Sequence, residues 1–189
     1  MSERWRCFVA LPIGDELREA LAVTVEAWHD RPELPGLRWT DHESWHVTLA
    51  FLGHRPAEEV SRIAATLQDV TARHGPMELS GGKMGAFPSA ARARVVWYGI
   101  VNADGSLKHL ARELRAALDV DTAQPFRPHI TIARAKREPV DLRSFLAGER
   151  GPSMIWRATR VDLMRSHLGR GPARYELIES AALGAVSRV

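Results

Sequence analysis

Apolar and polar residues alternate in short segments along the chain, with the period of two that indicates β-strands. Strands are predicted at residues 4–11, 37–40, 46–52, 77–79, 94–101, 129–133, 154–164 and 173–183. Between them, apolar residues recur every three to four positions in segments that begin near residues 14, 56, 105 and 140, which predicts helices there. The order strand, helix, strands, helix occurs twice, so the pattern favours an α+β protein built from two similar halves.

Two of the predicted strands carry nearly the same four-residue motif. Residues 46–49 are His-Val-Thr-Leu and residues 129–132 are His-Ile-Thr-Ile. Because side chains at i and i+2 of a strand share a face, each motif presents a histidine and a threonine on one face and two apolar side chains on the other. We therefore expect a single bilobal domain over residues 1–189 with one motif per lobe. The lobes are expected to be two antiparallel sheets related by a pseudo-twofold axis, with helices on their outer faces and the active-site cleft between the sheets.

Four side chains would meet in that cleft, namely His46, Thr48, His129 and Thr131. Two facing histidines can act as a general acid and a general base near neutral pH. One accepts a proton from the attacking group and the other donates a proton to the leaving oxygen, while the threonine hydroxyls bind the non-bridging phosphoryl oxygens. This chemistry predicts phosphodiester cleavage that requires no metal ion.

Composition narrows the interpretation only slightly. The 189 residues are 45% hydrophobic and 26% charged, as in an ordinary globular protein, and the single cysteine, Cys7, excludes an internal disulfide bond. The apolar segment 7–13 is too short to span a membrane and lacks a signal-peptide layout, so we expect a cytoplasmic monomer with no membrane partner. The net charge of +3 includes 23 arginines and three lysines, which allows an RNA partner without requiring one.

The sequence around the two motifs resembles a known family, the two-histidine phosphoesterases, and most closely the RNA 2′,3′-cyclic phosphodiesterases first described as 2′-5′ RNA ligases. The blocks that carry this resemblance span nearly the whole chain, at residues 8–11, 45–53, 85–88, 96–99, 125–134, 165–169 and 174–176. The resemblance implies cofactor-independent hydrolysis of the 2′,3′-cyclic phosphate end of a tRNA-like RNA or an oligonucleotide, leaving a 2′-phosphate, with weak reverse 2′-5′ ligation. It also implies that His46 is the general acid and His129 the general base. The residues alone do not separate these roles, because the motifs are nearly symmetric.

Two arginines are candidates for binding the phosphate together with the threonines. Arg127 lies two residues before His129, so strand parity places it on the catalytic face, although Pro128 can disturb the pleat. Arg134 lies five residues after His129, where parity predicts the opposite face. The family that this chain resembles has a phosphate-binding arginine five residues after the second histidine of the pair. This resemblance favours Arg134 over Arg127.

Several alternatives stay open. Residues 42–46 match the H-E-x-x-H zinc motif, but that motif requires a helix and a strand is predicted to begin at His46. The glycine-rich residues 81–85 lack phosphate-loop spacing and are expected to form a turn or bulge. Phe51 is either a stacking surface for a base or part of the core. Other possible functions are a non-catalytic RNA-end or nucleotide-binding module, or a phosphodiesterase for another small cyclic phosphate. The remaining histidines carry no motif: His29, His54, His74, His109 and His167.

Overall fold

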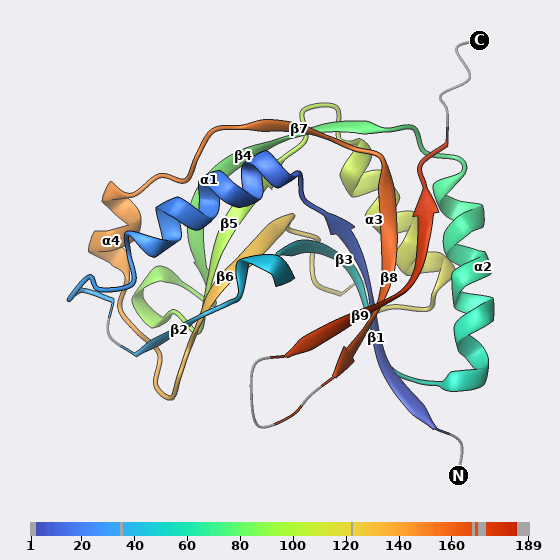
Figure 1. Ribbon diagram of the computed structural model, residues 1–189, viewed down its shortest axis with the longest axis horizontal. Helices are drawn as coiled ribbons and strands as arrows, with labels where there is room; N and C mark the ends of the chain where they lie inside the picture. The colour runs from blue at the N-terminus through green and yellow to red at the C-terminus, as the bar shows by residue number, and fades with distance from the viewer. Residues whose placement is uncertain (1–2, 35, 122, 168, 170–172, 185–189) are drawn as a thin grey trace.

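The fold is dominated by one strongly curled antiparallel sheet (Figure 1). The structure, a computed structural model, describes all residues except 1–2, 35, 122, 168, 170–172 and 185–189. Its strands are β1 (Arg4–Pro12), β2 (Leu37–Trp39), β3 (His46–Pro56), β4 (Met77–Phe87), β5 (Val95–Val101), β6 (His129–Ala135), β7 (Ile155–Ala158), β8 (Arg160–His167) and β9 (Arg174–Ala182). They are ordered β7-β4-β5-β6-β3-β1-β8-β9, and β2 pairs with β6.

Helices pack on the apolar side of this sheet. They are α1 (Asp15–Glu26), α2 (Val60–Thr71), α3 (Ser106–Ala117) and α4 (Arg143–Gly148), with 3-10 turns η1 (His42–Ser44), η2 (Ala57–Glu59) and η3 (Ala90–Arg92). As its periodicity predicts, α1 buries Leu17, Leu21 and Val25. In the described residues, α3 packs on β3 and α2 on β8 and β9, and in the view of Figure 1 α1 is drawn in front of β4 and β5. None of these helices is long and apolar enough to cross a membrane.

The two halves of the sheet meet at β3 and β6. These strands are joined by one register pair, Val47 with Ile130, and both side chains are completely buried. The α+β class with antiparallel strands is thereby confirmed, and the structure adds that the two predicted sheets are continuous through this pair. Since the strands are antiparallel, the faces that carry the histidines and threonines lie side by side on the opposite side from the helices.

Two details of the predicted strand pattern were wrong. Residues 154–164 form two strands rather than one, with β7 paired to β4 and β8 paired to β1, because a period of two does not reveal where a chain changes partner. The strand predicted at residues 77–79 continues as β4 to Phe87, so the glycine-rich residues 81–85 lie inside it. The expected bulge is present as a register shift between Gly81 and Met84. Packing explains why residue 85 is a glycine, because a side chain there would overlap the ring of Trp97.

Candidate active site

A cleft of about 470 Å³ lies over the junction of β3 and β6. The register pair at this junction sets His46 across from Thr131 and Thr48 across from His129. All four side chains line the cleft, together with Arg134. Five of the six site residues predicted from the sequence are thus brought together, and the sixth, Arg127, lies elsewhere.

Both histidines are anchored in the same way. The Nδ1 atom of His46 lies 2.7 Å from the carbonyl oxygen of Ser44, and the Nδ1 atom of His129 lies 2.6 Å from that of Arg127. A carbonyl oxygen only accepts hydrogen bonds, so each Nδ1 carries the proton and each ring keeps Nε2 for proton transfer. Each acceptor lies two residues before its histidine, so the spacing is the same in both motifs. It could not be recognised in the sequence, because the acceptor is a main-chain carbonyl and not a particular side chain.

His46 lies in the more enclosed position. Its ring stacks on Phe8 at a centroid distance of 4.9 Å and meets the ring of Tyr175 edge-on at 5.3 Å. Its Nε2 atom lies 3.1 Å from the Oγ1 atom of Thr48, so the hydroxyl donates a hydrogen bond to the neutral imidazole. Neither aromatic partner was predicted, although both lie in blocks that resemble the family.

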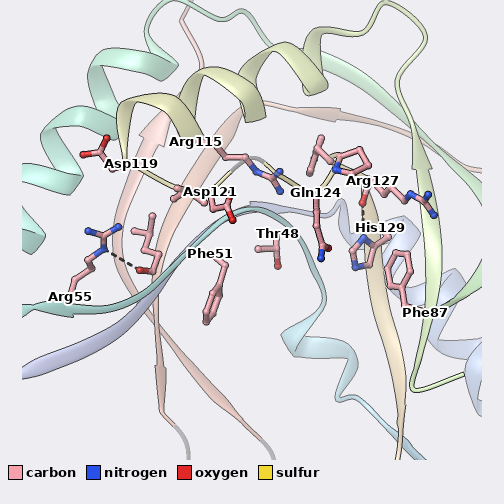
Figure 2. A pocket seen from close by; sticks show the side chains of 14 residues that line it. Thr48, Phe51, Arg55, Phe87, Arg115, Asp119, Asp121, Gln124, Arg127 and His129 are labelled. Atoms are coloured by element: carbon pink, nitrogen blue, oxygen red, sulfur yellow. Dashed lines mark hydrogen bonds between the residues drawn. The ribbon is translucent and has the colours of Figure 1, made fainter. Parts of the chain in front are cut away.

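His129 stands at the edge of a second and larger hollow. Phe87 contacts its ring edge-on at a centroid distance of 5.1 Å, and Trp97 lies 6.1 Å away. The hollow has a volume of about 760 Å³ and is also lined by Thr48 and Phe51. Figure 2 shows His129, Thr48 and Phe51 around one open space. His129 therefore adjoins this hollow, which His46 does not line, whereas His46 lines a third hollow of about 680 Å³ beside Asp41 and Tyr175.

The surroundings lower the pKa of both histidines. Burial is the main cause at His46, where the charges of His129 and Arg134 act in the same direction and the hydrogen bond to the Ser44 carbonyl opposes them. Burial is also the main cause at His129, where the Arg127 carbonyl opposes the shift and the charge of Arg134 adds to it. In the free protein both rings therefore favour the neutral form, whereas a bound phosphate anion would favour protonation.

A bulge explains why Arg134 reaches the cleft although strand parity predicts otherwise. Trp97 of β5 pairs with Thr131, and its neighbour Val96 pairs with Ala133. One step along β5 therefore corresponds to two steps along β6, so β6 contains one extra residue. An extra residue reverses the alternation beyond it and turns Arg134 onto the face of His129. No feature of the sequence marks this bulge.

Arg127 contributes its carbonyl oxygen rather than its side chain to the histidine pair. The side chain lines the larger hollow and not the cleft between the histidines, and in Figure 2 it extends away from Thr48 on the far side of His129. The parity argument does not apply to it, because β6 begins only at His129. The geometry therefore favours Arg134 as the phosphate-binding arginine.

Phe51 occupies on β3 the position that Arg134 occupies on β6. Ala10 of β1 pairs with Thr48 and Val9 with Ala50, so β3 contains the same bulge and Phe51 turns toward the cleft. Its side chain is 48% exposed, which contradicts the core interpretation. The guanidinium of Arg6 lies 4.6 Å from the ring centroid of Phe51.

The alternative zinc motif does not form a helical site. His42 and Glu43 belong to the 3-10 turn η1, and His46 begins β3, so the two histidines do not share a helix face. In the described residues, the single cluster with metal-ligand geometry consists of His74, His109 and Glu113. None of these residues belongs to the zinc motif or to either histidine–threonine motif.

Comparisons with known proteins place the chain in one family. Residues 17–170 match the family model of the 2′-5′ RNA ligase superfamily. The chain is 31% identical to an RNA 2′,3′-cyclic phosphodiesterase of Escherichia coli over 97% of this chain and 99% of that protein. It is 30% identical to a protein of the same name from Geobacillus stearothermophilus over 96% of this chain, but it spans only 58% of that relative.

Solved structures show the same fold. LigT of E. coli, crystallised with 3′-AMP, superimposes with a TM-score of 0.76 at 28% identity, over 96% of this chain and 99% of that one. The protein TT0787 of Thermus thermophilus gives a TM-score of 0.77 at 29% identity, with the same coverage.

Proposed function

The chain belongs to the 2′-5′ RNA ligase superfamily, and we propose that it hydrolyses the 2′,3′-cyclic phosphate ends of RNA to 2′-phosphates. The observation that carries this proposal is the pair of histidines in one cleft, each with Nδ1 anchored on a main-chain carbonyl and Nε2 left for proton transfer. Relatives named RNA 2′,3′-cyclic phosphodiesterase, which match nearly the whole chain, support the same activity.

His129 is proposed as the general base. Its Nε2 atom accepts a proton from water, and the water oxygen forms the new bond to phosphorus. One observation supports this role: the hollow beside His129 gives water access. Burial, with a contribution from the charge of Arg134, lowers the pKa of His129 and so favours the neutral form that a base requires, and the same two causes act on His46.

His46 is proposed as the general acid. As the bond from phosphorus to the 3′ oxygen breaks, the protonated Nε2 atom of His46 donates its proton to that oxygen, which leaves a 3′-hydroxyl and a 2′-phosphate. Charge on the phosphoryl oxygens would be held by Thr48, Thr131 and Arg134, all of which line the cleft. In the reverse direction an RNA 5′-hydroxyl takes the place of water, which would give a weak 2′-5′ ligase activity.

The remaining proposals concern the whole protein. The β3–β6 junction, which completes the cleft within one chain, supports a single bilobal domain over residues 1–189 that acts as a monomer. We also propose a cytoplasmic location, because a single free cysteine, Cys7, suits a reducing compartment.

The test is to incubate the protein with a short RNA that ends in a 2′,3′-cyclic phosphate, in excess EDTA, and to identify the terminal phosphate. A 2′-phosphate product that disappears with His46→Ala and with His129→Ala is expected. A 3′-phosphate product would reverse the proposed leaving group. Turnover that requires added zinc would contradict the two-histidine mechanism, and binding without turnover would favour a non-catalytic RNA-end module.

A further inference from the structure

The catalytic cleft contains more positive charge than the reacting group can balance. Its described lining residues include Arg6, Arg38 and Arg134 but no aspartate or glutamate. A 2′,3′-cyclic phosphate is a diester with a single negative charge. If Arg134 binds that phosphate, the charges of Arg6 and Arg38 are left over.

Arg38 lies directly opposite Arg134. The two residues form a register pair between β2 and β6, and both are exposed. Like charges directly opposite each other on a sheet destabilise it. The arginine ion pairs of the described residues involve neither Arg38 nor Arg134, so no described carboxylate offsets this repulsion. A bound anion would relieve it.

Arg6 is engaged differently. Its guanidinium stacks on Phe51 at 4.6 Å and donates a hydrogen bond to the Oγ atom of Ser166 at 3.1 Å. Bases of single-stranded nucleic acids stack on exposed aromatic rings, and arginine adds cation–π contacts to such surfaces. Arg6 therefore belongs with Phe51, and Arg38 is left as the arginine without an assigned partner.

Arg6 and Phe51 lie at one end of the cleft, and Arg38 and Arg134 lie at the other. Phe51 lies four residues beyond Val47 and Arg134 four residues beyond Ile130, and because these strands are antiparallel the two run in opposite directions from the pair that joins them. A nucleotide whose cyclic phosphate sits between the histidines can place its base toward Phe51, and the rest of the RNA then leaves past Arg38.

We infer that Arg38 binds the phosphodiester that joins the terminal nucleotide to the preceding one, so that the cleft selects an RNA end over a free cyclic mononucleotide. The inference rests on the proposed function. A guanidinium fork matches the geometry of a phosphate, and a second anion beside Arg134 balances both facing charges.

The test compares three substrates with Arg38→Gln: adenosine 2′,3′-cyclic phosphate, the same nucleotide with a 5′-phosphate, and a dinucleotide that ends in a cyclic phosphate. The substitution is expected to lower kcat/KM about tenfold for the last two, the loss of one charge-assisted hydrogen bond, and to change the first less than about twofold. Arg62→Gln, which removes an exposed arginine of α2 paired with Glu59, is the matched control and should change none of them.

Equal losses on all three substrates would place Arg38 on the reacting phosphate and overturn the inference, as would no loss on any. Binding provides a readout that does not depend on turnover. The affinity for a dinucleotide 2′-phosphate should depend on salt with a slope about 0.7 smaller in Arg38→Gln, whereas affinity for adenosine 2′-phosphate should not change slope. A wild-type protein that binds in this way without cleaving would contradict the proposed function and leave the role of Arg38 intact.

Folding of the variant can be checked in the same samples. Because Arg38 faces Arg134, its replacement by glutamine should raise the Tm of the free protein slightly rather than lower it. Phosphate should then raise the Tm of the variant less than that of the wild type. A lower Tm without ligand would mean that Arg38 stabilises the fold.

Discussion

Strands β3 and β6 carry the same motif and the same bulge, yet they end in different chemistry. Each places a histidine and a threonine on the cleft face, and each bulge turns the fifth residue after the histidine onto that face as well. On β6 this residue is Arg134 and on β3 it is Phe51. The repeated part of the strands positions the proposed proton-transfer groups, and the part that differs makes the two ends of the cleft unlike.

The difference extends to the surroundings of the histidines. His46 is stacked on Phe8 and hydrogen-bonded to Thr48, whereas His129 adjoins an open hollow. The charge of Arg134 acts on both rings. A symmetric backbone can therefore support the asymmetric reaction proposed, because the residues around each histidine, and not the motif, decide what each ring contacts and which hollow it adjoins.

Removal of either histidine should have the largest effect. His46→Ala and His129→Ala are each expected to lower kcat by about 10²–10⁴-fold, the usual contribution of a general acid or base. Since the two groups act in one step, the double variant should be little worse than the poorer single variant. Kinetics on a cyclic-phosphate dinucleotide measure this directly. Losses that multiply in the double variant would show that the two strands act independently.

Replacement of Arg134 should have the next largest effect and should separate β6 from β3. Arg134→Gln removes a charged donor to the phosphoryl oxygens and is expected to lower kcat by about 10²-fold, with Arg134→Lys intermediate. Arg127→Gln is the matched control, because its side chain lines the other hollow and its carbonyl, which anchors His129, is retained. A larger loss for Arg127→Gln would reverse the assignment of the two arginines.

Much of this arrangement could be predicted from the sequence because it depends on period and repetition. The motifs at residues 46–49 and 129–132, the helical stripe of α1 and the α+β class follow from local patterns that the structure retains. The association of the two motif strands needs only that both carry an apolar face to bury.

What the sequence did not reveal depends on register and on the main chain. The bulges that redirect Phe51 and Arg134 come from pairing between strands, and strand parity alone places both residues on the wrong face. The anchoring of His129 uses a carbonyl, which every residue has. Arg38 becomes notable only when its partner across the strands is known to be Arg134. The bulges and the pair of Arg38 with Arg134 are relations between distant segments, and the carbonyl that anchors His129 is a local main-chain group that no side-chain pattern marks.

Truncation of Phe51 should have a smaller effect, mainly on binding. Phe51→Ala is expected to raise KM about tenfold for an RNA that ends in adenosine, since stacking of one base contributes about 1–3 kcal/mol, while kcat changes little. Phe51→Trp should retain the wild-type KM because it keeps an aromatic face. A loss in kcat with an unchanged KM would show that Phe51 acts on the reacting groups as Arg134 does, which would remove the contrast between the two ends.

The smallest expected effect is on the pH dependence, and it tests whether one charge governs both rings. Burial lowers the pKa of His46 and of His129, and the charge of Arg134 lowers both further, so the bell-shaped profile of kcat/KM should have its maximum below about pH 6.5, the ordinary pKa of histidine. Arg134→Gln removes a positive charge, which raises the pKa of both rings and should move both limbs to higher pH, while Arg134→Lys should keep the wild-type profile. If only one limb moved, Arg134 would act on a single histidine, and that limb would identify it: the acidic limb belongs to the base and the alkaline limb to the acid.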